Sequence, residues 1–256
     1  MSQAQTLPRD PKAGPPQASA GAASALSVRG LDVYYGQSQV LREVDLDLRP
    51  GRITALMGRN GVGKSTLLKA ITGLLPARTG SIRMGEKRLD GQAPEKRARQ
   101  GLAYVPQGRE IFPKLTIEEN LLMGLEARAD GLRKIPEDEI YSLFPVLAQM
   151  KTRLGGNLSG GQQQQLAIAR ALVGAPKVLL LDEPTEGIQP SIIQDIERVL
   201  TGLKDKGGMA ILLVEQYLDF ARRLGDDYYI MERGSMVMGG DIESLTEDHI
   251  KKHLAF

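Results

Sequence analysis

The sequence predicts an α/β domain in which a parallel sheet carries a phosphate-binding loop. A glycine-rich run at residues 58–66 lies between an apolar stretch of strand length, 52–57, and a helical pattern, 65–71. Two continuous apolar runs, 178–181 and 210–214, are typical of parallel strands covered on both faces. With 256 residues, the chain is long enough for one large α/β domain or two small ones.

Composition excludes several classes of function. The 33 basic and 31 acidic residues leave a formal charge of +2, too balanced to predict a nucleic-acid partner. Cysteine is absent, so the chain forms no disulfide and no thiolate metal site. No apolar run is long enough to cross a bilayer, and no basic segment followed by an apolar one opens the chain. We therefore expect a soluble protein that is not exported.

The first elements follow from composition and alternation. Residues 1–26 are rich in Ala, Pro, Gly, Ser and Gln, which favours a disordered tail, and the folded domain is expected at 27–256. Apolar and polar residues alternate at 31–35 and 44–48, as in antiparallel strands with one face in water. Residues 79–84 are expected to extend that sheet.

The middle of the chain changes to a helical pattern. After a short buried strand at 102–105, residues 113–155 read as a helical insertion. Thr116 and Glu119 have the spacing of a capping box, and apolar residues within 140–147 continue a 3.6-residue stripe. Further on we expect a helix from residue 190, and a closing hairpin formed by 228–231 and 236–238.

The glycine-rich run has the residues that bind a nucleoside triphosphate. Its glycines let backbone N–H groups turn toward phosphates, Lys64 supplies positive charge to the β- and γ-phosphates, and the Ser65 hydroxyl can contact Mg²⁺. The nucleotide-binding residues that this run predicts are Gly58, Arg59, Asn60, Gly61, Val62, Gly63, Lys64, Ser65 and Thr66. ATP and Mg²⁺ are the cofactors that this loop predicts.

Two carboxylates, Asp182 and Glu183, follow the buried run at 178–181. In an open parallel sheet, ligands bind at the edge where such strands end. Asp182 can hold Mg²⁺ next to Ser65, while Glu183 can orient a water or accept its proton as that water attacks the γ-phosphate. The alternative is that both acids only cap the turn before Pro184.

Taken together, these residues resemble the ATPase subunits of ATP-binding-cassette transporters. The phosphate loop, Gln107, the segment Leu-Ser-Gly-Gly-Gln at 158–162 and the run 178–183 occur in the family's order and spacing. The resemblance implies a RecA-like parallel core, an antiparallel β subdomain and a helical subdomain at about 113–155. It also implies a head-to-tail dimer in which each ATP contacts the phosphate loop of one subunit and the 158–162 segment of the other.

The residues assigned to that contact in trans are Ser159, Gly160, Gly161 and Gln162. They stand at a predicted helix start, where free N–H groups and the positive end of the helix dipole favour a phosphate. The alternative is a flexible turn.

The resemblance assigns three further roles. Tyr35 matches the aromatic residue that stacks on adenine, and Gln107 matches a glutamine that reaches Mg²⁺. Gln216 occupies a position where the family usually has histidine, so hydrolysis is not expected to depend on a titrating imidazole; we assign it with Lys64 and Glu183 to catalysis. The histidines of the chain, His249 and His253, are expected to be solvated.

The sequence departs from the family pattern at a second place, and other residues indicate which branch of the family, and so which substrate, it resembles. Residues 186–189 end in Gln, where the family more often has Asp. Residues 104–112 and 214–216 resemble the branch that imports branched-chain amino acids, amides and urea. Residues 162–166 and 182–193 resemble its urea importer most, so urea import is the main expectation, and import of branched-chain amino acids or short amides is the alternative.

The implied setting is the inner face of the cell membrane. The partners are a second, different but related ATPase, two membrane permease subunits and, indirectly, a solute-binding protein. Residues 111–115 would give an apolar patch for a permease. Two rival functions are a soluble ATPase of translation or DNA repair, which usually has two cassettes or a long coiled-coil insertion, and a non-hydrolysing ATP clamp.

Overall fold

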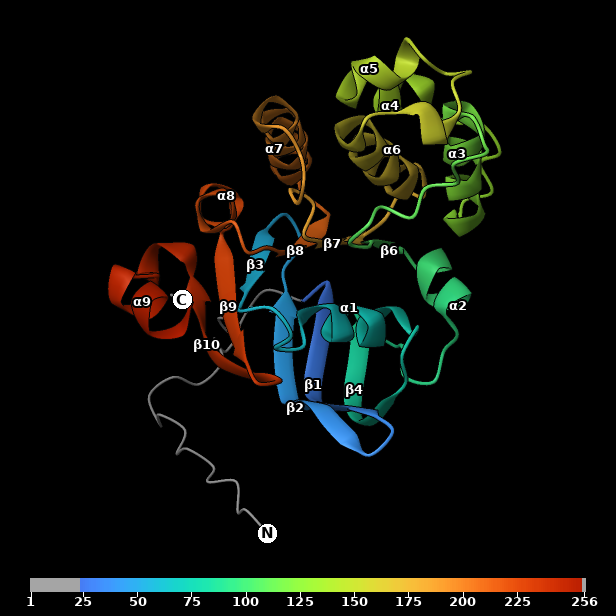
Figure 1. Ribbon diagram of the computed structural model, residues 1–256. Coiled ribbons are helices and arrows are strands. Elements are labelled where there is room, and N and C mark those ends of the chain that lie inside the picture. Colours follow the sequence, from blue (N-terminus) through green and yellow to red (C-terminus); the bar gives the residue numbers. More distant parts are fainter. Residues whose placement is uncertain (1–23, 255–256) are drawn as a thin grey trace.

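The computed structural model describes residues 24–254 as two sheets and a helical region that projects from them (Figure 1). The predicted tail lies mostly at residues 1–23, outside the described part. Strand β1 begins at Leu26, so the predicted boundary at residue 27 is one residue late. Within 24–254, no helix has the length and apolar character that crossing a membrane requires.

The smaller sheet is antiparallel, as alternation predicts. Its strand order is β2 (Ser38–Leu48), β1 (Leu26–Tyr35), β4 (Ala77–Met84) and β5 (Lys87–Arg88). In β1 the apolar side chains Leu26, Val28, Leu31 and Val33 are fully buried, while the residues between them are exposed or half-buried. The predicted strand at 79–84 is confirmed as part of this sheet.

The larger sheet supports the site. Its order is β10 (Ser235–Asp241), β9 (Asp227–Glu232), β3 (Ile53–Met57), β8 (Ala210–Val214), β7 (Val178–Asp182) and β6 (Leu102–Val105). All pairings are parallel except β10 with β9, which form the expected hairpin. Every residue of β3, β7 and β8 is buried, which explains why these strands read as continuous apolar runs.

Alternate residues of this sheet face two different cores. Leu179 and Leu181 of β7 join the cluster formed with the helical region, whereas Val178 and Leu180 join the one formed with α1 (Lys64–Thr72) and the antiparallel sheet. Helix α1 therefore packs between the two sheets (Figure 1). Apolar contacts with both sheets therefore hold the helix that follows the phosphate loop.

The helical region consists of short helices. They are α3 (Ile117–Gly124), α4 (Glu137–Leu143), α5 (Pro145–Ala148) and α6 (Gly160–Val173). The capping box is confirmed: the Glu119 N–H donates to Thr116 Oγ1 at 3.2 Å, and the Thr116 N–H donates to the Glu119 carboxylate at 2.7 Å. The stripe at 140–147 is not one helix, because Pro145 disfavours helical backbone at Phe144, whose φ is −130°.

The remaining helices flank the larger sheet. They are α2 (Pro94–Arg99), α7 (Pro190–Asp205), α8 (Leu218–Leu224) and α9 (Glu247–His253), with 3₁₀ turns at Leu125–Ala127, Gly155–Asn157 and Ile242–Ser244. The expectation of solvated histidines is wrong for His253. Its Nδ1 lies 2.7 Å from the Glu232 carboxylate and its side chain is 11% exposed, because α9 packs beside β9. His249 belongs to the capping box of α9.

Candidate active site

The phosphate-binding loop connects β3 to α1, as predicted. Gly58, Gly61 and Gly63 have φ values of 156°, 76° and 116°. A Cβ on Gly58 would lie 2.5 Å from the Met231 carbonyl oxygen, and one on Gly63 would lie 2.8 Å from a Leu41 methyl. Backbone conformation therefore favours glycine at all three positions, and close packing adds to this at Gly58 and Gly63.

Lys64, the first residue of α1, is folded back onto this loop. Its ammonium donates to the carbonyl oxygens of Gly58 at 2.8 Å and Arg59 at 3.0 Å, and lies 3.7 Å from a Glu183 carboxylate oxygen. Burial lowers the pKa of Lys64, while the nearby carboxylates act to raise it. A phosphate that enters the loop would replace these contacts with a stronger acceptor.

Asp182 closes β7 directly opposite Ser65. The Ser65 hydroxyl donates to one Asp182 carboxylate oxygen at 3.3 Å, and the Tyr104 hydroxyl donates to the other at 3.2 Å. Burial raises the pKa of Asp182, although both hydrogen bonds act to lower it, and burial also raises the pKa of Tyr104. A hydroxyl beside a buried carboxylate next to a phosphate loop fits Mg²⁺, which prefers one or two protein oxygen ligands together with phosphates.

Sequence reasoning missed Tyr104. It lies in the predicted strand β6, and nothing in the linear sequence shows that β6 pairs with β7 beside Asp182. Only the strand order places the two side chains together.

Glu183 follows Asp182 with a left-handed backbone, φ 48°, and its N–H donates to the Val214 carbonyl at 2.9 Å. This conformation is uncommon for a residue with a side chain and is typical of functional sites. Its carboxylate accepts a hydrogen bond from Gln107 at 3.3 Å and faces Lys64. The predicted acid is thus positioned by a strained turn at the end of β7.

A cavity of about 280 Å³ brings together half of the predicted site residues. It is lined by Asn60, Gly61, Gly63, Lys64, Ser65, Thr66, Gln107, Glu183, Glu186 and Gln216. Tyr35 does not line it; its side chain is 48% exposed on the antiparallel sheet, next to Tyr34, which carries Arg78 over its ring. The structure brings Ser65 and Asp182 together but turns Gln107 toward Glu186, 2.8 Å away.

Glu215 is a buried carboxylate that the sequence analysis did not single out. One of its oxygens accepts from the Thr185 N–H at 3.1 Å and the Thr185 hydroxyl at 2.9 Å. The other accepts from the N–H groups of Gln216 at 3.1 Å and Tyr217 at 3.3 Å. Glu215 therefore ties the loop after Glu183 to the loop that carries Gln216. An acid directly after the buried run 210–214 was the available signal.

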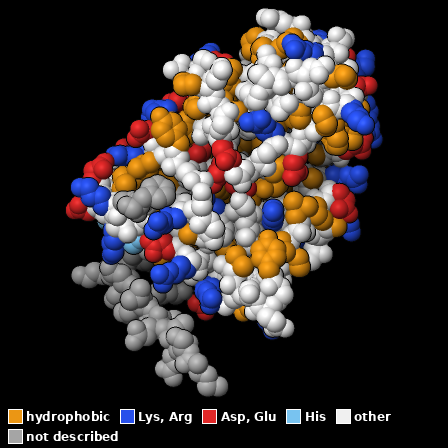
Figure 2. Space-filling view, in the orientation of Figure 1, with side chains coloured by type: hydrophobic (Ala, Val, Ile, Leu, Met, Phe, Trp, Pro, Cys, Tyr) orange, Lys and Arg blue, Asp and Glu red, His pale blue; other side chains and the backbone are white. Residues whose placement is uncertain are grey.

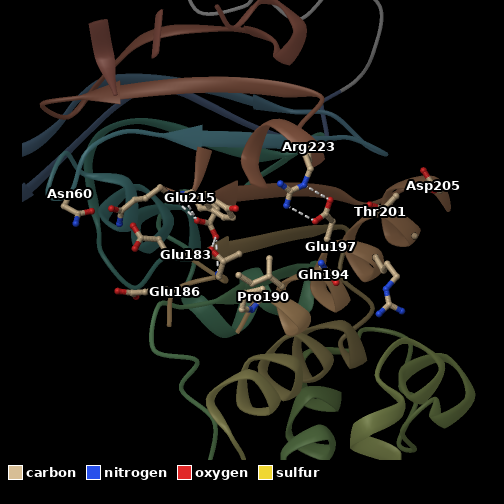
Figure 3. Close-up of a pocket in the computed structure, with 16 residues that line it drawn as sticks. Asn60, Glu183, Glu186, Pro190, Gln194, Glu197, Thr201, Asp205, Glu215 and Arg223 are labelled. Carbon is tan, nitrogen blue, oxygen red and sulfur yellow. Dashed lines mark hydrogen bonds and ion pairs between the residues drawn. The ribbon is translucent and has the colours of Figure 1, made fainter. Parts of the chain in front are cut away.

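An open groove of about 1370 Å³ extends from this site along α7. Figure 3 shows Glu183, Glu186 and Asn60 at one end of the groove and Thr201 and Asp205 at the other. Between them, Arg223 donates two hydrogen bonds of 3.0 Å to the Glu197 carboxylate, which links α8 to α7.

The predicted contact in trans lies elsewhere. Ser159 caps α6, since the Gln162 N–H donates to its hydroxyl at 3.3 Å and the Gln162 side chain accepts from its N–H at 2.9 Å. Ser159, Gly160, Gly161 and Gln162 line a second cavity, of about 390 Å³, that shares no lining residue with the phosphate-loop cavity. The structure therefore does not bring this segment to the phosphate loop of its own chain.

The class of protein follows from this geometry: an α/β domain with a glycine-rich loop before α1, an acid at the end of β7 beside the hydrogen-bonded pair Ser65 and Asp182, and a separate helix start with the sequence Leu-Ser-Gly-Gly-Gln. Residues 41–186 match the family model described as ABC transporter. The chain belongs to this family and is one of its ATPases, which couple ATP hydrolysis to transport.

Two relatives and a solved structure extend over nearly the whole domain. The chain is 41% identical to the high-affinity branched-chain amino acid transport ATP-binding protein BraG of Pseudomonas aeruginosa, over 83% of this chain and 91% of that protein. It is 36% identical to the probable branched-chain amino acid transport protein LivF of Archaeoglobus fulgidus, over 85% and 92%. A solved ATP-binding subunit of an ABC transporter superposes with a TM-score of 0.75 at 30% identity, covering 90% and 92%.

Proposed function

We propose that this chain is the ATP-hydrolysing subunit of a membrane importer for branched-chain amino acids. The observation that carries the substrate class is the 41% identity to BraG. The urea expectation came from residues 162–166 and 182–193, and neither relative named above is a urea transporter. Import of branched-chain amino acids therefore takes the first place, and urea becomes the competing outcome of the test.

The phosphates of ATP would enter the cavity of about 280 Å³ at the start of α1. Loop N–H groups and Lys64 would hold the β- and γ-phosphates, with Lys64 exchanging the Gly58 and Arg59 carbonyls for phosphate oxygens. Ser65 and Asp182 would hold Mg²⁺, which when bound neutralises charge on the phosphates.

Glu183 is the group placed to act on the attacking water. Its carboxylate lines the same cavity as Lys64 and Gln216. It would orient the water and accept its proton while the bond from the γ-phosphorus to the bridging oxygen breaks, giving ADP and phosphate. The Gln216 carboxamide would donate an N–H to the γ-phosphate.

We further propose that a second, related ATPase chain completes each ATP-binding site. The helix start at Ser159 opens into a cavity separate from the phosphate loop, and the first turn of α6 carries no acidic residue. Free N–H groups there suit the phosphates of a nucleotide on a facing subunit. A different but related partner chain remains the prediction for this branch of the family.

The permeases are expected to dock on the helical region. Of the eight large apolar side chains exposed in the described chain, four belong to it: Leu122, Met123, Leu132 and Leu154. A fifth, Phe112, lies just before it, with Arg170 of α6 over its ring. Figure 2 shows apolar side chains on this region at the top of the view. Such exposure suits contact with two membrane subunits on the inner face of the membrane, with a solute-binding protein acting through them.

The test compares wild type with Glu183→Gln in cells that have no other copy of this protein. Uptake of labelled leucine and labelled urea is measured, together with ATPase turnover and ATP binding of the purified protein. We expect Glu183→Gln to retain ATP binding, to lose turnover by at least about a hundredfold, and to lose leucine uptake. Glu247→Gln, which changes a side chain that is 68% exposed, is the matched control and should behave as wild type.

Each outcome has a distinct meaning. Loss of urea uptake with leucine uptake intact would move the substrate to urea and leave the ATPase mechanism in place. Wild-type turnover by Glu183→Gln would remove Glu183 from the catalytic role. If neither solute's uptake changes while the folded variant is present at normal levels, the importer proposal is wrong.

A further inference from the structure

Gln107 is held by two carboxylates at the edge of the phosphate-loop cavity. It follows β6, and its Nε2 lies 2.8 Å from a Glu186 carboxylate oxygen and 3.3 Å from a Glu183 carboxylate oxygen. Because ionised carboxylates only accept hydrogen bonds, the carboxamide must turn its NH₂ group toward them. The same group therefore bridges the catalytic acid and a neighbouring acid.

Glu186 has no part in the chemistry proposed above. It is exposed, yet it lines both the phosphate-loop cavity and the groove along α7 (Figure 3). Within residues 24–254, its carboxylate has one hydrogen-bond partner, Gln107. A carboxylate whose one hydrogen bond within the described residues goes to a residue of the site is placed to control that residue.

We propose that Glu186 is a positioning residue that holds Gln107 against Glu183 in the nucleotide-free protein and releases it when metal and nucleotide bind. The inference rests on the proposed function, since it requires a nucleotide in the cavity and Mg²⁺ at Ser65 and Asp182. While Gln107 bridges the two acids, its NH₂ occupies the Glu183 oxygen that faces it. Gln107 is the glutamine predicted to reach Mg²⁺, and a carboxamide held by these two acids is not available to the metal. Glu186 thus opposes occupation of the metal site through Gln107, without a hydrogen bond to Ser65 or Asp182.

The direction in which one substitution shifts the Mg²⁺ requirement separates this role from simple electrostatics. Removing a carboxylate close to a cation site weakens cation binding by coulombic attraction alone. Glu186→Gln keeps the size of the side chain and one acceptor oxygen, but it replaces a charge-assisted hydrogen bond with a neutral one of about half the strength. If Glu186 acts by holding Gln107, the substitution must make Mg²⁺ act at a lower concentration, whereas the coulombic effect alone would raise that concentration.

The experiment titrates Mg²⁺ into the purified full chain with a fluorescent non-hydrolysable ATP analogue, so the readout is binding and not turnover. We expect the half-saturating Mg²⁺ concentration to fall about threefold in Glu186→Gln and up to about tenfold in Glu186→Ala. In a Gln107→Ala background, the Glu186 substitutions should produce no fall. Asp205→Asn removes a carboxylate from the far end of the same groove and should leave the midpoint unchanged.

An unchanged or raised midpoint in Glu186→Gln overturns the inference, as does an equal fall in the presence and absence of Gln107. A folding defect would appear as a shift of the urea-unfolding midpoint, which Glu186→Gln should leave as in wild type because the side chain is exposed. If wild type binds the analogue at no Mg²⁺ concentration, the failure belongs to the proposed nucleotide function and not to the role of Glu186.

Discussion

Replacing Glu215 by Gln tests how the loops around the site are held. Its two oxygens accept four hydrogen bonds, from the Thr185 N–H and hydroxyl and from the Gln216 and Tyr217 N–H groups. A carboxamide has one accepting oxygen and must point its NH₂ at one of these two pairs. If the NH₂ group faces Thr185, the Thr185 hydroxyl can turn to accept from it, but the Thr185 N–H loses its acceptor. If the NH₂ group faces the other pair, the N–H groups of Gln216 and Tyr217 both lose their acceptor.

The smallest loss is therefore one buried N–H, which costs about 1–3 kcal/mol. The remaining bonds also lose charge assistance, so we expect Glu215→Gln to lower the free energy of unfolding by about 2–4 kcal/mol in total. Removal of a buried charge acts in the opposite direction, because burial raises the pKa of Glu215. The donor set outweighs this gain in the amide, because three of its four members are backbone N–H groups that can only donate and an NH₂ nitrogen cannot accept from them, whereas the hydroxyl oxygen of a protonated carboxyl still can.

Urea unfolding of the nucleotide-free protein measures the effect. The matched control is Glu247→Gln, whose carboxylate pairs with Arg222 at 2.9 Å and is 68% exposed; it should cost less than about 1 kcal/mol. A Glu215→Gln protein as stable as wild type, or more stable, would refute the reasoning and show that desolvation of the charge dominates.

The raised pKa of Glu215 also makes the stability of the fold depend on pH. The folded protein holds this proton more tightly than the unfolded chain, whose carboxyl titrates near 4.5, so the contribution of Glu215 to stability falls as pH rises from that value through the folded pKa. The carboxamide of the variant does not titrate. The stability difference between wild type and Glu215→Gln should therefore widen as the pH is lowered from 7 toward 5, and a difference that narrows would contradict the shift.

Three other predictions concern the metal site, the helical region and Gln216. Asp182→Asn should change the free energy of unfolding by less than about 1 kcal/mol, since its two partners are hydroxyls, one of which can donate to the amide oxygen while the other accepts from the NH₂ group. Nucleotide binding should nevertheless lose its Mg²⁺ dependence, and retained dependence would rule out Asp182 as a ligand. Gly124→Ala should lower the free energy of unfolding in urea by about 1–3 kcal/mol, because its Cβ would lie 2.3 Å from the Arg170 carbonyl oxygen. Gly202→Ala, whose Cβ would have nothing within 4 Å, should instead stabilise α7 by about 0.5–1 kcal/mol. Equal effects of the two substitutions would contradict the close approach at Gly124. Gln216→His should give the ATPase pH–rate profile a limb near pH 6.5, the usual pKa of about 6.5 for histidine, and a wild-type limb assigned to this position would disprove the assignment.

Local sequence patterns predict the elements of this fold better than they predict side-chain partners. The buried runs at 178–181 and 210–214 could be recognised because strands covered on both faces are almost entirely apolar. The Thr116 capping box could be recognised because its two bonds join residues three apart. Tyr104 could not, since its role depends on which strands are neighbours. For Glu215 the position after a buried run was a signal, but its partners on the loop after Glu183 were not predictable. Likewise, the stripe at 140–147 has helical spacing, but Pro145 divides it, because backbone restriction overrides side-chain periodicity.

The charges of the site explain why metal and nucleotide should bind as a unit. Asp182, Glu183 and Glu215 surround one ammonium, that of Lys64, so the nucleotide-free site has more buried negative than positive charge. Burial raises the pKa of Asp182 and Glu215 and lowers that of Lys64, which means that each of these groups is destabilised in its charged form. A cation alone would compensate the carboxylates but leave Lys64 on loop carbonyls, and a triphosphate alone would compensate Lys64 while adding negative charge beside Asp182. Only the metal–nucleotide pair compensates both, so each ligand should bind more tightly in the presence of the other.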